Sequence, residues 1–169
     1  KPEVAADFLI PLKGKIGRIG VFVNESVETI SQIYSDGLID IVQLHGDEDK
    51  EFCENIERNG IPYIKVIRVP SESVAIDLTD SLADNILLDT YVPNYGGEGE
   101  VFNWSLAREF IQSHPEKKVY LAGGINLQNI AQAVAVNPYM IDIASGAESS
   151  PGVKDLEVVE SLLKKVSIT

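Results

Sequence analysis

Six short apolar runs, rich in β-branched residues, alternate along the chain with segments of helical periodicity. We expect strands at residues 18–23, 40–44, 63–69, 85–89, 119–122 and 140–144. Strands that are apolar at nearly every position are typical of a sheet covered on both faces. Repeated strand and helix units of this kind predict an α/β protein with parallel strands.

Apolar residues between these runs recur at spacings of three and four, which predicts a helix after each strand. The expected helical faces are Val27, Ile30 and Tyr34; Phe52 and Ile56; Val74, Leu78 and Leu82; Leu106, Phe110 and Ile111; Leu127, Ile130 and Val134; and Leu156, Val159, Leu163 and Val166. An opening helix would carry Val4 and Phe8. No linker or low-complexity tract interrupts the pattern, so we expect a single domain over residues 1–169.

Charge and composition narrow the classes of partner. The net charge is −12 and no basic cluster is visible, which argues against a nucleic-acid or anionic-membrane partner. The apolar runs fall short of the ~20 residues needed to span a bilayer, and the one cysteine, Cys53, suits a reducing compartment. We therefore expect a cytoplasmic protein, and a small anionic ligand remains compatible with backbone binding.

Polar or glycine residues follow nearly every expected strand, including His45 and Gly46, Asp89, and two glycine segments. An open doubly wound sheet gathers its site at one switch point, whereas a barrel builds its site from the loops after many strands. The pattern thus favours a (β/α)8 TIM barrel, of which the chain supplies an opening helix and six βα units, matching strands 3 to 8.

The last two expected strands each run into a glycine segment, 121–126 (LAGGIN) and 143–147 (IASGA). Barrel enzymes often bind phosphate at the loops after strands seven and eight, where glycine lets the anion approach backbone N–H groups. Gly123, Gly124, Ser145 and Gly146 are therefore candidate phosphate-binding residues. The alternative is that these glycines only permit tight turns, but two matched segments favour phosphate.

Asp89 ends an apolar strand and is followed by a long segment, 91–104, that has neither helical nor strand periodicity. An aspartate at a barrel mouth is a candidate proton donor if its surroundings raise its pKa. Capping a turn is the commoner role of such a residue. The segment is a candidate lid, and Asn103 is expected to cap the helix that begins at Trp104.

Gln43 and His45 share one face of their strand because side chains alternate with a period of two. Both are candidate substrate-binding residues, although a structural role is equally plausible for His45. Cys53 lies between Phe52 and Ile56 and is interpreted as a packing residue rather than a nucleophile. No cluster of Cys or His has metal-ligand spacing, so we expect no metal.

Taken together, seven segments resemble the phosphoribosylanthranilate isomerase family of tryptophan biosynthesis. They are GVFVNES, VQLHGDE, LLD, YGGEG, FNW, LAGGIN and IDIASGAESSPGVKD, and they cover nearly the whole chain in order. The resemblance implies an aldose-ketose isomerase, an intramolecular oxidoreductase, that uses no cofactor. It would convert N-(5-phosphoribosyl)anthranilate into 1-(2-carboxyphenylamino)-1-deoxyribulose 5-phosphate by an Amadori rearrangement.

The resemblance implies that Asp89 is the general acid, which protonates the furanose ring oxygen while a base removes the proton at ribose carbon two. The family's base is a cysteine in a Lys-Ile-Cys-Gly segment, which nothing in this chain matches. The arginine that the family uses near the anthranilate carboxylate is also absent. Glu98 stands where the family often has Ser or Thr, and Asn103 where it often has Asp.

Six strands do not close an eight-stranded barrel, so we expect two further βα units to precede this chain in its gene. Residues 18–23 and 140–144 would then present open apolar edges that favour self-association. One alternative is a non-catalytic phosphate-binding fragment. Another is indole-glycerol-phosphate synthase, which needs catalytic lysines on its strands, where we expect only Lys65.

Overall fold

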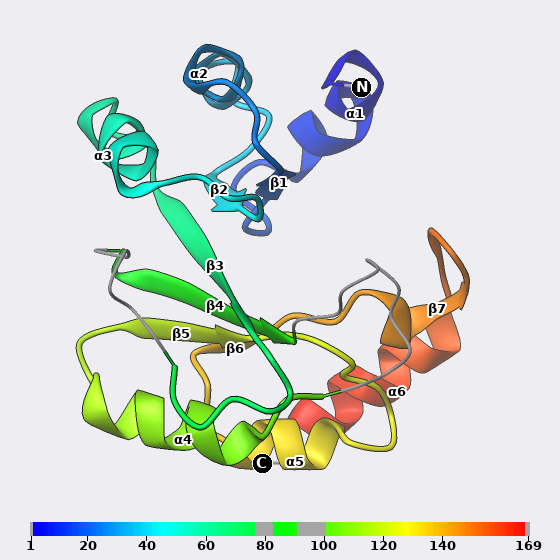
Figure 1. Ribbon diagram of the computed structural model, residues 1–169. Coiled ribbons are helices and arrows are strands. Elements are labelled where there is room, and N and C mark those ends of the chain that lie inside the picture. The colour runs from blue at the N-terminus through cyan, green and yellow to red at the C-terminus, as the bar shows by residue number, and fades with distance from the viewer. Residues whose placement is uncertain (1, 77–82, 91–100, 168–169) are drawn as a thin grey trace. The chain divides into compact units, whose positions relative to one another are not determined.

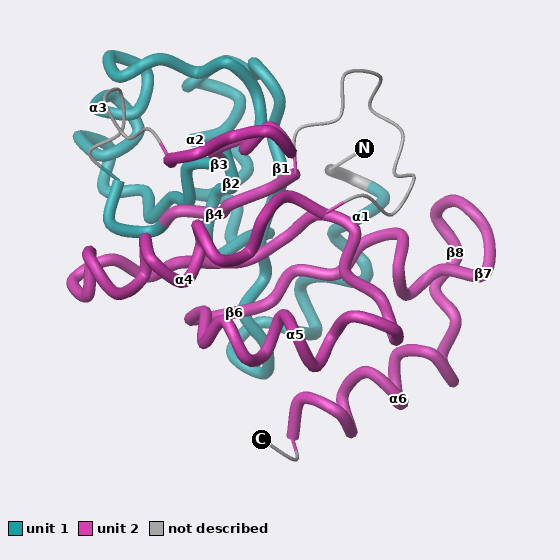
Figure 2. The backbone as a smooth tube through the Cα atoms, turned by 60° about the horizontal axis from the view of Figure 1, so that its bottom comes forward, with its two compact units in different colours: residues 1–66, 78–85 teal, residues 67–77, 86–169 magenta. Residues whose placement is uncertain are grey.

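The computed structural model describes residues 2–76, 83–90 and 101–167. It divides into two compact units, residues 1–66 with 78–85 and residues 67–77 with 86–169, which Figure 2 draws in teal and magenta. No helix among the described residues is long and apolar enough to cross a membrane. The expectation of a single domain stays a prediction.

The first unit contains parallel strands that follow chain order (Figure 1). Strand β1 (Ile19–Phe22) pairs with β2 (Ile41–Leu44), which pairs with β3 (Tyr63–Val69). Its helices are α1 (Pro2–Leu9), α2 (Val27–Ser35) and α3 (Lys50–Arg58), with a 3-10 turn, η1 (Ile10–Leu12), after α1. These elements confirm the strands expected at 18–23, 40–44 and 63–69.

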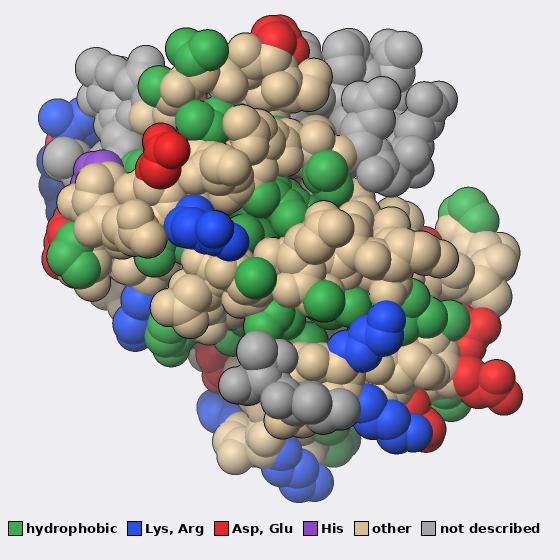
Figure 3. All heavy atoms as spheres, turned by 90° about the horizontal axis from the view of Figure 1, so that it is seen from below, with side chains coloured by type: hydrophobic (Ala, Val, Ile, Leu, Met, Phe, Trp, Pro, Cys, Tyr) green, Lys and Arg blue, Asp and Glu red, His purple; other side chains and the backbone are tan. Residues whose placement is uncertain are grey.

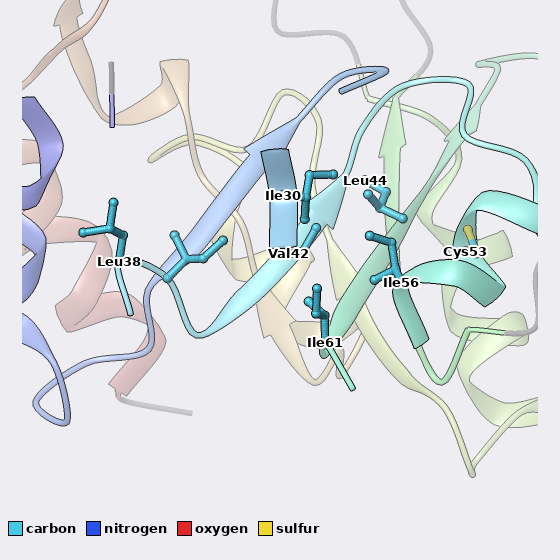
Figure 4. Close-up of a cluster of buried hydrophobic side chains, with 8 residues drawn as sticks. Ile30, Leu38, Val42, Leu44, Cys53, Ile56 and Ile61 are labelled. Atoms are coloured by element: carbon cyan, nitrogen blue, oxygen red, sulfur yellow. The ribbon is translucent and has the colours of Figure 1, made fainter. Parts of the chain in front are cut away.

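One apolar cluster holds the first unit together. Helices α2 and α3 contribute Ile30, Cys53 and Ile56, and strand β2 contributes Val42 and Leu44, as Figure 4 shows. Each of the isoleucine, valine and leucine side chains in this set has no exposed surface. Burying a side chain of this size stabilises the fold by roughly 1.5–3 kcal/mol, so the helices are fixed against β2, which carries Gln43 and ends just before His45.

The second unit begins with the end of β3 and continues through β4 (Asn85–Thr90), β5 (Lys118–Leu121) and β6 (Met140–Ile141). Helices α4 (Trp104–Ser113), α5 (Ile130–Ala135) and α6 (Leu156–Ser167) follow these strands. The N–H of Ala122 donates to the carbonyl of Leu88 at 2.9 Å, and β5 pairs with β6 in parallel. The ends of β4 and β5 therefore lie together.

Several expectations need correction. Strand β6 is two residues long, not five, and a small antiparallel hairpin of β7 (Glu148–Ser150) and β8 (Val153–Lys154) was not expected. It follows a 3-10 turn, η2 (Ser145–Ala147). The helix expected to carry Val74 is not confirmed, because Val74 lies in a bend and is 90% exposed, while Leu78 and Leu82 lie outside the described residues.

The faces of the first and last helices also differ from the expected ones. Val4 and Phe8 are exposed, and α1 packs on the core through Ala6 and Leu9. On α6, Leu156, Leu163 and Val166 are exposed and Leu162 is buried. Both helices carry apolar residues on more than one face. The face that packs against the core differs from the one that the apolar spacing predicted.

Candidate functional site

Asp89 lies near the end of β4, where the sequence analysis placed it. Leu87 and Leu88 before it are buried, whereas Asp89 itself is half-buried. Because β4 is apolar up to this residue, the strand is anchored in the core and delivers the carboxylate to its end. The position suits a group that must be held rigidly and still meet a ligand.

Gly123 packs directly beside this carboxylate. Its backbone is left-handed, with φ +84°, and a Cβ added to it would overlap the Thr90 side chain and lie 2.8 Å from Oδ1 of Asp89. Only glycine fits a position of this kind without strain and without displacing its neighbours. The structure thus brings together the predicted acid and the first predicted phosphate-binding glycine.

The loop after Gly123 is held by two asparagine side chains. Gly124 is also left-handed, with φ +65°, and its carbonyl oxygen accepts hydrogen bonds from Nδ2 of Asn126 and Nδ2 of Asn129, both at 3.0 Å. The N–H of Asn126 donates to Oδ1 of Asn129 at 2.8 Å. Because these bonds fix the carbonyl of Gly124, the geometry of the glycine pair is set by the protein before any ligand binds.

Gly146 brings the second glycine segment against the first. A Cβ on Gly146 would overlap the carbonyl oxygen of Ile125, two residues beyond Gly123 and Gly124 along the chain. Ser145 and Gly146 belong to the turn η2, which lies between β6 and β7. The two segments that the sequence pairs as a phosphate site are therefore in contact in the structure.

Gln43 and His45 lie in the first unit, on and just beyond β2. Their side chains face the same way, as expected, with Nε2 of Gln43 3.1 Å from Nδ1 of His45. Gln43 is 5% exposed, whereas His45 is half-buried. Of this pair, His45 is therefore the side chain better placed to meet a ligand.

Glu48 is a site residue that the sequence analysis missed. Its carboxylate accepts hydrogen bonds from the N–H of Asn24 at 2.9 Å, from the N–H of Gly46 at 3.0 Å and from Nζ of Lys65 at 2.9 Å. Burial raises the pKa of Glu48, but these bonds outweigh burial and leave the pKa below its ordinary value. Two of these partners, Asn24 and Lys65, lie 24 and 17 residues away in the sequence, so no local pattern predicts the contacts.

The region around the candidate lid is described only at its end. Residues 91–100, including Glu98, lie outside the described residues. After them, Phe102 is buried and its N–H donates to Oγ1 of Thr90 at 3.2 Å. Asn103 caps α4 by accepting a hydrogen bond from the N–H of Ser105 at 3.0 Å, which confirms the expected cap. This stretch is thus tied back to the residue next to Asp89.

Cys53 is buried among the core side chains of α3, which confirms its interpretation as a packing residue. Burial raises the pKa of its thiol. A nucleophilic or basic cysteine needs the thiolate, which a low pKa and solvent access favour. Cys53 therefore has neither property of a catalytic cysteine.

Known proteins match this chain over nearly its whole length. The model of the family N-(5'phosphoribosyl)anthranilate (PRA) isomerase matches residues 4–165. The N-(5'-phosphoribosyl)anthranilate isomerase of Bacillus cereus is 41% identical over 166 residues, which cover 97% of this chain and 80% of the relative.

Solved structures are similar over the whole described fold. The phosphoribosyl anthranilate isomerase of Thermus thermophilus has a TM-score of 0.85 at 31% identity, covering 99% of this chain and 80% of that one. A phosphoribosyl anthranilate isomerase in complex with reduced 1-(o-carboxyphenylamino)-1-deoxyribulose 5-phosphate has a TM-score of 0.75 at 28% identity, covering 100% of this chain and 80% of that one. The chain belongs to the N-(5'-phosphoribosyl)anthranilate isomerase family.

Proposed function

We propose that this chain carries the general acid and the phosphate site of an enzyme that converts N-(5'-phosphoribosyl)anthranilate into 1-(2-carboxyphenylamino)-1-deoxyribulose 5-phosphate. The observation that carries the proposal is the contact between Asp89 and Gly123, where a Cβ would lie 2.8 Å from the carboxylate. An acid and a phosphate site that adjoin in this way fit a substrate whose reacting sugar bears a terminal phosphate.

The roles follow from the reaction. Protonated Asp89 gives its proton to the furanose ring oxygen, the bond between that oxygen and carbon one breaks, and the ring opens to an iminium ion. A base then removes the proton at carbon two, which gives an enolamine that rearranges to the ketone. General acid-base transfers of this kind contribute about 10²- to 10⁴-fold each.

The phosphate group would be held by backbone donors of Gly123, Gly124, Ser145 and Gly146. Gln43 and His45 are proposed to contact the rest of the substrate. On the face drawn in Figure 3, Lys and Arg side chains are scattered among acidic and apolar ones. This face therefore lacks the clustered cations that binding of a polyanion requires.

The base and the anthranilate-binding arginine of the family have no counterpart in the printed sequence. We propose that both come from the family's first two βα units, which would also complete an eight-stranded barrel. The apolar side chains of Ile19, Val21 and Val23, on and beside β1, are exposed at 36%, 60% and 56%. Self-association of the chain through such edges is a further expectation of this proposal.

The experiment joins the chain to the first two βα units of the Bacillus cereus relative and follows loss of fluorescence of the anthranilate substrate. The joined protein should be active, and Asp89→Asn should lower kcat about 100-fold or more. Asp84→Asn, an exposed change just before the same strand, should leave kcat unchanged. If both the joined protein and the chain alone were inactive, that result would count against the proposed isomerase activity.

Indole-glycerol-phosphate synthase remains the weaker alternative. Lys65 in β3 donates to Glu48 at 2.9 Å and to the carbonyl of Gly46 at 3.2 Å. The structure corrects one premise, because Lys118 also lies in a strand, at the start of β5, where its Nζ sits 5.1 Å from the ring centre of Tyr139. Both lysines are thus engaged by protein groups.

A further inference from the structure

The proposed reaction gives no role to the hairpin β7–β8 of the second unit. Its strands pair Glu148 with Lys154, and Gly152 in the connecting turn is left-handed, with φ +79°. The hairpin starts directly after the turn η2, which carries Ser145 and Gly146 of the proposed phosphate site. Its placement therefore makes it a candidate support for that site.

Lys154 reaches back from the hairpin to the start of the phosphate turn. Its Nζ donates to the carbonyl oxygen of Ala144 at 2.7 Å and to Oε1 of Glu148 at 2.7 Å. The N–H of the next residue, Asp155, donates to the carbonyl of Ala147 at 2.9 Å. Hydrogen bonds from Lys154 and Asp155 therefore hold the backbone on both sides of Ser145 and Gly146, at Ala144 and at Ala147.

The charge of Lys154 matters because the two glycine segments, 121–126 and 143–147, contain no Lys or Arg of their own. An ammonium has three N–H donors, and Ala144 and Glu148 take two. The side chain is 48% exposed, so its charge stays accessible to an approaching anion. Glu148 opposes that charge with a carboxylate held by Lys154 and by the N–H of Gly152 at 3.1 Å.

We infer that Lys154 is a positioning residue of the phosphate site, which fixes the Ser145–Gly146 turn and supplies it with a cation that Glu148 attenuates. The inference rests on the proposed function, because it presumes that this turn binds the substrate's phosphate. It separates two roles of the hairpin. If the hairpin were only a structural brace, loss of either Lys154 or Glu148 would weaken phosphate binding. If the charge of Lys154 acts on the phosphate, loss of Lys154 weakens binding and loss of Glu148 strengthens it.

The test titrates the ¹⁵N-labelled chain with inorganic phosphate. NMR spectra follow the amide signals of Gly123, Gly124, Ser145 and Gly146. Lys154→Met should weaken phosphate binding about three- to fivefold, as expected for one exposed charge contact. Lys154→Arg should retain most of the phosphate affinity of the parent. Glu148→Gln should tighten binding, because it removes the opposing charge and leaves Lys154 in place.

Two changes on α6 serve as matched controls. Lys164→Met changes the net charge as Lys154→Met does, and Glu160→Gln changes it as Glu148→Gln does. Both positions are exposed, and within the described residues no bond links either side chain to residues 144–147. Neither should shift the phosphate affinity by more than the change in overall charge. The amide spectra of all variants show at the same time whether each one remains folded.

The outcomes distinguish this inference from the proposed function. If the amides respond to phosphate but Lys154→Met binds as tightly as the parent, or Glu148→Gln weakens binding to the same extent, the role of Lys154 is wrong and the phosphate site stands. If no amide of the parent responds, the phosphate site is wrong and this inference falls with it. In the joined enzyme, Lys154→Met should raise KM for the substrate more than it lowers kcat.

Discussion

Nζ of Lys65 lies 2.9 Å from Oε2 of Glu48, and only 14% of the lysine side chain and 1% of the glutamate side chain are exposed. The same carboxylate receives the N–H groups of Asn24 and Gly46. The buried carboxylate of Glu48, in the loop after β2, therefore binds both the loop after β1, through Asn24, and strand β3, through Lys65.

Removing one partner of this pair should cost much more than removing both. Glu48→Gln or Lys65→Met alone leaves a buried polar group without its counterpart and should lower the free energy of unfolding by about 3 kcal/mol. The double variant should lose clearly less than the sum. Urea unfolding of the four proteins measures this coupling, and strictly additive losses would show that the pair contributes nothing specific.

Gly123→Ala should harm both stability and activity. Its left-handed backbone disfavours any side chain, and the added methyl group would press on Thr90 and Asp89. Gly60→Ala has a similar φ of +68° but open space around the new methyl group, so it isolates the backbone cost, roughly 1 kcal/mol. Gly123→Ala should exceed that cost and also lower kcat in the joined enzyme. Equal effects of the two changes would contradict a close approach to Asp89.

Cys53 should be dispensable for catalysis. Because its thiol is buried and burial raises its pKa, it should react slowly with a disulfide reagent in the folded protein and quickly in urea. Cys53→Ala should keep the activity of the joined enzyme while losing some stability from the cavity. Rapid labelling of the native protein, or loss of kcat in Cys53→Ala, would overturn its assignment as a packing residue.

The ion pair of Arg18 and Asp40 should set part of the acid stability of the first unit. Hydrogen bonds from the Arg18 side chain and backbone lower the pKa of Asp40 from its ordinary value of 3.8 to about 2. A depressed carboxyl pKa stabilises the fold above the ordinary value, and this contribution is lost as pH falls from about 4 to about 2.

Asp40→Asn should therefore be less stable than the parent at pH 5, and the difference should shrink at pH 3. Urea unfolding at both values measures it, with Asp36→Asn as an exposed control on the same loop. A stability difference that is the same at pH 5 and pH 3 would show that the ion pair does not stabilise the unit through the charge of Asp40.

The sequence was sufficient to predict elements whose patterns are local. Among the described residues, apolar runs located strands β1 to β6, and the position of Asn103 before a helical pattern predicted its cap, because each of these signals lies within a few residues. The sequence predicted that the two glycine segments share a function, but it did not predict the contact of Gly146 with Ile125. Its geometry depends on how strands pack, which periodicity does not encode.

Other features could not be predicted for identifiable reasons. On α6, Leu162 and Leu163 are adjacent, so apolar spacing alone allows either to face the core. The strands of the β7–β8 hairpin are three and two residues long and largely polar, which gives no alternating pattern to detect. Glu48 looks like any charged loop residue until Asn24 and Lys65 are brought to it by the fold.

The absence of room for a single methyl group between Gly146 and Ile125 has a consequence for protein engineering. Because Gly146 packs against the backbone of Ile125 and Asn126, any side chain at position 146 would displace the first glycine segment. On the proposal that these segments bind the substrate's terminal phosphate, retargeting the protein to a different terminal group requires transplanting both segments at once, together with the β7–β8 hairpin.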